Sequence, residues 1–179
     1  MGGTERMSVV VVGTEGHEPN PLPRELTGIK VGVDATSLIF LHACAKAATN
    51  KEAYRLIWDF DDSADLLGWY EVIYEDDFPE VVPIRYGVNI LEWNWGKQQP
   101  TAKYCYGADL VACGPEQDPI TFFAFEWTSP RLGKAVQEIR LKGSKRFRGA
   151  VPGFENSFGE VIPNNAVILK AVSYVQRRV

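Results

Sequence analysis

The sequence predicts an all-β fold, an antiparallel β-sandwich with little helix. Between Ser37 and Trp95, apolar and aromatic residues alternate with polar ones, which is the period of a half-buried strand. Short runs rich in Val, Ile, Phe, Tyr and Trp are bounded by Gly, Pro, Asp and Asn, as strands are bounded by turns. Aromatic residues make up 12% of the chain, which fits β structure or a stacking site. Several short strands separated by turns favour a sandwich or a barrel.

The individual elements follow from the same rule. A first strand is expected over residues 8–12, and the segment 14–28, with three prolines, is expected to be an arm or loop. Helix-forming residues gather only in 45–57, enough for a turn or two within a long loop. The remaining expected strands cover residues 29–33, 37–44, 67–75, 80–86, 109–113, 120–127, 135–141 and 165–175.

Length and composition narrow the class of protein. A chain of 179 residues is expected to form one domain with a sizeable core, in which residues 1–28 are the N-terminal strand and Pro-rich arm. The net charge of −4 argues against a general nucleic-acid binder. Cys44, Cys105 and Cys113 are odd in number and lack CxxC spacing, which argues against a disulfide scaffold and a zinc site. They are expected to be buried or half-buried free thiols, with one disulfide as an alternative.

No apolar run approaches the roughly 18–20 residues that a membrane-spanning helix needs. The opening MGGTERMSVVVVG has too short an apolar core for a signal peptide and no small-residue cleavage site. Two locations therefore stay open. The chain is cytoplasmic, or it is a piece of a longer secreted protein and is extracellular or periplasmic.

Strand direction predicts which loops share an end of the sandwich. We define the top as the end that strand 37–44 reaches, so the turn near Asp76–Pro79 is expected at the bottom. Strand 120–127 is taken to run upward. The loops expected at the top are then 45–66, 87–108 and 128–134, and the basic loop 142–164 is expected at the bottom.

Four segments of the chain carry a resemblance to a known family. They are Phe40-Leu41-His42, the hairpin from Tyr70 to Asp76, the stretch from Pro83 to Ile90, and Phe125-Glu126-Trp127 with Pro130. Over residues 29–175 the chain resembles the galactose-binding-like jelly-roll modules attached to bacterial glycoside hydrolases and related polysaccharide-degrading proteins. The glycine that usually follows the hairpin aspartate is replaced by Asp77, so a longer turn is expected. The resemblance implies a non-catalytic sugar-binding or accessory role.

Aromatic residues in or beside the top loops are the candidate sugar platform. Exposed aromatic faces stack on the C–H faces of pyranose rings, while a few polar groups bind the hydroxyls. The alternative is that these rings fill the core, as Trp69 and Trp127 within strands are expected to do. Trp93 and Trp95 share a face if the segment is extended, so both are core or both are platform. The expected ligand-binding residues are Trp58, Asp61, Arg85, Asn89, Trp93, Trp95, Tyr104 and Arg131, with a turn cap as the alternative for Asn89.

An acidic cluster in one top loop is a candidate metal site. Calcium takes 6–8 oxygen ligands, so an oxygen-rich loop suits it, although the fold requires no cofactor. The spacing is not that of an EF-hand. A solvated acidic loop and a glycosidase acid/base pair are the alternatives. The cluster consists of Asp59, Asp61, Asp62 and Asp65.

His42 and the basic run are the other chemically notable features. A Cys–His nucleophile needs hydrogen-bond contact, but His42 and Cys44 stand two apart on a strand and do not touch closely. His42 is therefore expected to be a hydrogen-bonded, partly buried residue of the fold. The basic run from Arg140 to Arg148 is interpreted as a solvated loop, or as a contact for an acidic glycan or a neighbouring domain.

Three hypotheses for function follow. The favoured one is a non-catalytic carbohydrate-binding or accessory module of a polysaccharide-processing protein, whose partner is a poly- or oligosaccharide or the catalytic domain of a larger protein. The second is a structural domain that packs on a catalytic partner and has no ligand. The third is a glycosidase or lyase that uses the Asp59–Asp65 cluster.

Overall fold

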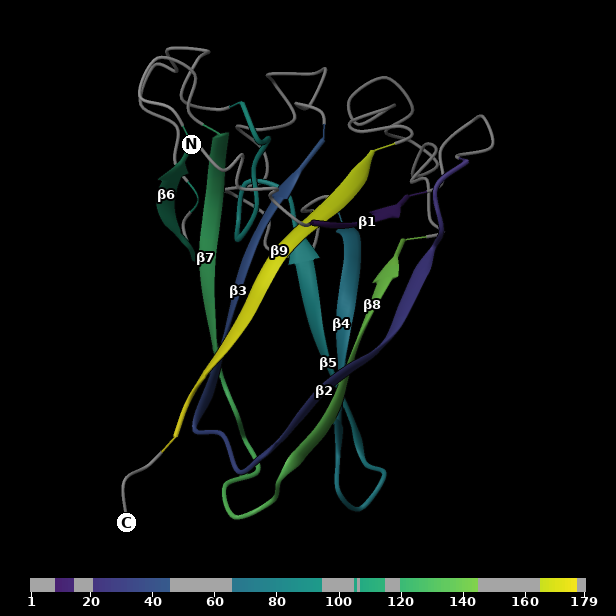
Figure 1. The fold of residues 1–179 in the computed structure, drawn as a ribbon, viewed down its shortest axis with the longest axis vertical. Helices are drawn as coiled ribbons and strands as arrows, with labels where there is room; N and C mark the ends of the chain where they lie inside the picture. The colour runs from purple at the N-terminus through teal and green to yellow at the C-terminus, as the bar shows by residue number, and fades with distance from the viewer. Residues whose placement is uncertain are drawn as a thin grey trace, which may run out of the picture.

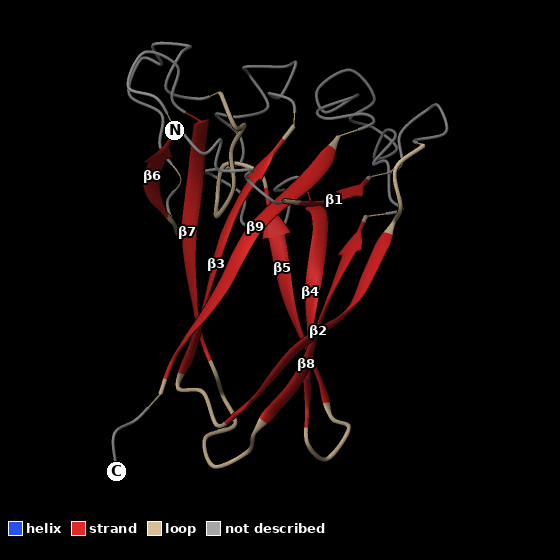
Figure 2. Cartoon of the chain, viewed as in Figure 1, coloured by secondary structure: helices blue, strands red, loops and turns tan. Residues whose placement is uncertain are grey.

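The structure is a computed structural model that describes residues 9–14, 21–45, 66–94, 105, 107–114, 120–144 and 165–176. These residues form two antiparallel sheets and no helix, which confirms the prediction of an all-β chain with two layers (Figures 1 and 2). The turn or two of helix expected in 45–57 lies outside the described residues beyond Ala45. The strands are β1 (Val10–Gly13), β2 (Glu25–Val33), β3 (Ser37–Cys44), β4 (Leu66–Tyr74), β5 (Pro79–Arg85), β6 (Asp109–Cys113), β7 (Ile120–Thr128), β8 (Val136–Gly143) and β9 (Ala166–Val175).

The strands are divided between a five-stranded and a four-stranded sheet. The five-stranded sheet has the order β1-β9-β3-β7-β6, and the four-stranded sheet has the order β2-β8-β4-β5. Every ladder is antiparallel. Several strands that are consecutive in sequence, such as β1 and β2 or β7 and β8, lie in different sheets. The connections between them join the two layers.

The core lies between the sheets because alternate residues of each strand point inward. Phe40 of β3 and Tyr70 of β4 stack across the two layers, with ring centroids 3.9 Å apart and an interplanar angle of 12°. Trp127 packs against this core, as expected. Trp69 does not, because Tyr70 and Val72 take the inward positions of β4 and leave Trp69 half-buried on the outer face.

Two glycines allow backbones to approach closely at the top of the sandwich. A Cβ on Gly68 would collide with the backbone oxygen of Lys142, and a Cβ on Gly143 would collide with that of Gly13. The Gly143 N–H also donates to Arg24 O at 2.8 Å. Glycine at position 143 therefore lets β1 cross the end of β8.

The direction of the later strands differs from the prediction. β7 pairs antiparallel with β3, with Ser37 opposite Thr128, so β7 runs downward and the loop 129–135 lies at the bottom. β5 and β6 both run upward, in different sheets (Figure 1). The prediction assumed a reversal between them. β8 consequently ends at the top, where Gly143 pairs with Gly68.

Candidate functional site

The predicted site residues divide into those the structure describes and those it does not. Trp58, Asp61, Trp95 and Tyr104 lie outside the described residues, as do the metal candidates Asp59, Asp62 and Asp65. Arg85, Asn89, Trp93 and Arg131 are described, and they occupy four different environments. The structure does not bring these four side chains together.

Arg131 lies at the bottom of the sandwich, at the opposite end from that expected, because β7 runs downward. Its Nη1 and Nη2 donate to Oδ1 and Oδ2 of Asp76, each at 2.8 Å. The guanidinium also lies over the rings of Tyr74 and Phe78, at 4.9 and 4.4 Å from their centroids. The hydrogen bonds from Arg131 lower the pKa of Asp76 to about 2. Arg131 therefore joins the β7–β8 loop to the β4–β5 turn.

That β4–β5 turn is longer than a two-residue hairpin turn, in keeping with the missing glycine. Asp77 N–H donates to Tyr74 O at 2.9 Å, and Tyr74 N–H donates to Phe78 O at 3.0 Å. Asp77 itself takes the left-handed conformation, with φ of 61°. A type I turn followed by a left-handed residue is a common three-residue hairpin loop, and aspartate tolerates this position better than most residues.

Asn89 is buried and closes the turn after β5. Its Nδ2 donates to Pro83 O at 2.9 Å, and its Oδ1 accepts from Arg85 N–H at 2.8 Å. The amide therefore acts as a cap within the fold. Arg85 is at the end of β5 opposite Leu66, and because its neighbour Ile84 is in the core, its side chain projects from the outer face of the four-stranded sheet.

His42 is fully buried between the sheets, more deeply than expected. Its Nε2 is 2.8 Å from Asn89 O, and its Nδ1 is 2.8 Å from the Tyr70 hydroxyl. A carbonyl oxygen can only accept, so Nε2 carries the proton and Nδ1 accepts from Tyr70. Burial lowers the pKa of His42 to about 4. His42 is thus a neutral residue that links β3 to β4 and to the Asn89 turn.

A buried carboxylate near the top was missed by sequence reasoning. Glu92 is 1% exposed, and its Oε2 accepts from the Tyr86 hydroxyl at 2.6 Å. Burial, and secondarily the charge of Glu92, raises the pKa of the Cys105 thiol. In the sequence, the indication of a buried carboxylate is a glutamate that stands between Leu91 and Trp93 in an apolar segment. Cys44, Cys105 and Cys113, all of them described, form no disulfide; the first two are buried and Cys113 is half-buried.

The segment that carries Glu92 also positions Trp93. Cys44 N–H donates to Leu91 O at 2.8 Å, and Trp93 N–H donates back to Cys44 O at 2.9 Å. Thr121 N–H donates to Trp93 O at 2.7 Å. These hydrogen bonds fix the segment between the last residue of β3 and the start of β7. They hold the indole ring beside the outer face of the five-stranded sheet.

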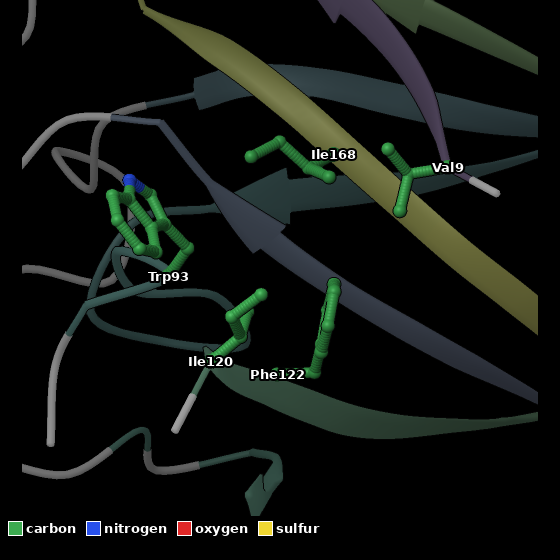
Figure 3. A pocket seen from close by; sticks show the side chains of 5 residues that line it. All are labelled: Val9, Trp93, Ile120, Phe122 and Ile168. Carbon is green, nitrogen blue, oxygen red and sulfur yellow. The ribbon is translucent and has the colours of Figure 1, made fainter. Parts of the chain in front are cut away.

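An open apolar hollow of about 250 Å³ lies there, and we call it the Trp93 hollow (Figure 3). Phe122 and Ile168 belong to this outer face because their neighbours Phe123, Val167 and Leu169 are in the core. Phe122 is only 2% exposed and is the least exposed part of the lining, whereas Val9 is 42% exposed. The lining side chains are Val9, Trp93, Ile120, Phe122 and Ile168.

Comparison with protein-family models, with curated proteins and with solved structures finds no match for this chain. Within the described ranges, no group of three or more His, Cys, Asp or Glu side chains could hold a metal ion. The same part of the chain contains no helix with the length and apolarity needed to cross a membrane. The Trp93 hollow, which is lined by described residues, is the candidate site considered below.

Proposed function

We propose that this chain is a non-catalytic accessory module of a polysaccharide-processing protein, and that the Trp93 hollow is its contact surface. The strand segments that resemble galactose-binding-like modules support the class. The observation that carries the mode of action is an open apolar hollow with a tryptophan wall on the outside of a sheet. Such a surface lowers its free energy when an apolar group covers it.

The size of the hollow limits what it holds. Its volume of about 250 Å³ is just below the roughly 300–1,000 Å³ of pockets that enclose a drug-sized ligand. It therefore accommodates one ring or one side chain. An apolar side chain from a catalytic partner domain fits this description.

A sugar ring is the second candidate for the hollow. Trp93 favours it, because an indole face stacks on the C–H face of a pyranose. The lining favours the apolar side chain instead, since among its described side chains the indole N–H of Trp93 is the one polar group. Sugar hydroxyls require polar partners, and an unmet hydrogen bond costs free energy on binding.

Small probes distinguish the two ligands by their effect on the indole N–H resonance of Trp93 in a ¹H–¹⁵N spectrum. N-acetyl-leucine amide and N-acetyl-phenylalanine amide imitate the partner side chain, and methyl glycosides imitate the sugar. The amides are expected to shift the indole resonance of Trp93 and the backbone amide resonances of Ile120 and Phe122, which line the same hollow. Trp93→Ala is expected to abolish the shifts of the two backbone resonances, while Leu132→Ala, at an exposed bottom position, keeps them. A shift with methyl glycosides alone would favour the sugar. No shift with either class would refute the proposal.

A further inference from the structure

Among the strands that the structure describes, the lower half of β9 has an open sheet edge. β1 pairs with β9 only from Ala166 to Leu169. Below Leu169, β9 pairs with β3 on one side and with no other strand that the structure describes. Tyr174 and Val175, which point to opposite faces, are 50% and 44% exposed. Half of the backbone N–H and C=O groups of an edge strand point outward, ready to pair with another strand.

The other sheet edges carry features that discourage such pairing. β5 contains Pro79 and Pro83, which have no N–H to donate. β2 is interrupted by register shifts and by Gly28 and Gly32 in the left-handed conformation, with φ of 85° and 73°. The other two edge strands are short, with five residues in β6 and four in β1. The stretch 170–176 has neither proline nor glycine, so it is the least protected edge among the described strands.

We propose that residues 170–176 form a dimerisation surface, on which β9 pairs antiparallel with β9 of a second copy. A two-fold axis perpendicular to the sheet places the same face of both copies on the same side. Residues opposite each other in an antiparallel pair also point to the same side, so the axis must pass between one residue and the same residue of the second copy. Ser173 is the centre of the available stretch, and this register alone uses all seven residues. The five-stranded sheet then continues into that of the second copy.

The side-chain pairs in this register are complementary, which favours a second copy as the occupant. Val172 faces Tyr174 on the inner side, and such a β-branched–aromatic pair is a favourable cross-strand neighbour. Ala171 faces Val175 on the outer side, and no like charges stand opposite each other. A seven-residue strand pair is small compared with the roughly 1,200–2,000 Å² of a stable interface. The dimer is therefore weak and depends on concentration.

Charge variants at the two-fold centre test both the surface and its register. In Ser173→Lys, two lysines face each other across the axis, and Ser173→Glu places two glutamates there. Each variant alone is expected to weaken association at least about tenfold, because opposed like charges cost free energy. An equimolar mixture of the two is expected to restore the dimer. Leu132→Lys, which changes an exposed residue away from β9, is the matched control.

Sedimentation equilibrium of the full chain over a range of concentrations measures the association, and circular dichroism checks that each variant is folded. The wild type and Leu132→Lys are expected to dimerise reversibly. A wild type that stays monomeric up to its solubility limit would overturn the proposal. So would Ser173→Lys protein that associates as tightly as the wild type, or a mixture that fails to restore the dimer.

Discussion

The buried histidine makes the stability of this fold sensitive to mild acid. Burial lowers the pKa of His42 from 6.5 to about 4. Between these values the unfolded chain binds a proton that the folded chain does not, so the free energy of unfolding falls as the pH falls. The loss begins near pH 6.5 and ends near pH 4, where folded His42 also becomes protonated. Stability is therefore greatest above pH 6.5 as far as His42 is concerned.

The size of the effect follows from the two pKa values. A difference from 6.5 to about 4 at about 1.4 kcal/mol per pH unit gives a loss of about 3 kcal/mol. The structural cause is clear from the contacts. Protonated His42 would place a charge on Nδ1, which now accepts from Tyr70, in a site with no exposed surface. About 3 kcal/mol is a large part of the roughly 5–15 kcal/mol that stabilises a typical domain.

The assay is urea unfolding at pH values from 7.5 to 4.5, followed by tryptophan fluorescence, for wild type and His42→Gln. The variant lacks the titrating group and keeps an amide donor for Asn89 O. It is expected to be less stable at pH 7.5, and the two stability curves are expected to converge by about 2.5 kcal/mol at pH 4.5. Carboxylates common to both proteins cancel in the difference. His17→Gln, which removes the other histidine, is expected to keep the wild-type slope. Parallel curves for wild type and His42→Gln would refute the reasoning.

Three further perturbations test other contacts. Arg131→Ala is expected to lower the melting temperature, because Asp76 loses its hydrogen bonds to Arg131. In the wild type, Asp76 contributes stability above pH 3.8 that is lost as the pH falls toward 2, and the variant is expected to lack this pH dependence. Thermal melts whose pH dependence between 4 and 2 is the same in both proteins would contradict this. Tyr86→Phe removes the hydroxyl bonded to buried Glu92 and is expected to cost about 1–3 kcal/mol in urea unfolding, whereas a cost near zero would show that the carboxylate needs no such donor. Gly143→Ala brings a Cβ against the backbone of β1 and is expected to increase amide exchange in β1 without loss of the core, so a fully protected β1 would argue against the close contact.

The strands could be predicted from the sequence because apolar alternation is a local property. The expected bounds of β3 and β6 match those observed, from Ser37 to Cys44 and from Asp109 to Cys113. Alternation does not say which face points inward. β4 has large apolar side chains on both faces, and Trp69 lies on the outer one. The directions of β6, β7 and β8 depend on how the chain passes between sheets after β5, which no local pattern encodes.

The candidate site was harder to predict because it depends on those nonlocal contacts. Asn89 has a side-chain amide, a group that can bind sugar hydroxyls. The amide is instead hydrogen-bonded to the backbone of the turn that it closes. Trp93 could be core or platform by sequence alone. Its place at the hollow is set by hydrogen bonds to Cys44 and Thr121, which lie far from it in the chain. The other aromatic and acidic candidates lie outside the described residues, so their roles stay predictions.

The outer faces of the two sheets differ in a way that directs contacts to the five-stranded sheet. On the four-stranded sheet, Lys142 pairs with Glu71 at 2.8 Å, and Glu138 pairs with Lys30 at 3.0 Å and with Arg140 at 3.1 Å. The Gly28 N–H, Lys30 and Arg140 together lower the pKa of Glu138 to about 2. These charges are already matched within the sheet, so covering them with a partner costs desolvation and gains little.

The upper part of the five-stranded sheet has the opposite character. Its outer face carries the apolar Trp93 hollow. Burying such a surface releases water without breaking any ion pair. The open edge of β9 belongs to the same sheet but lies below Leu169, beyond the residues that line the hollow. The two proposals thus place a partner contact at the top of this sheet and a second copy at its lower edge, and variants at Trp93 and Ser173 are expected to affect these two contacts independently.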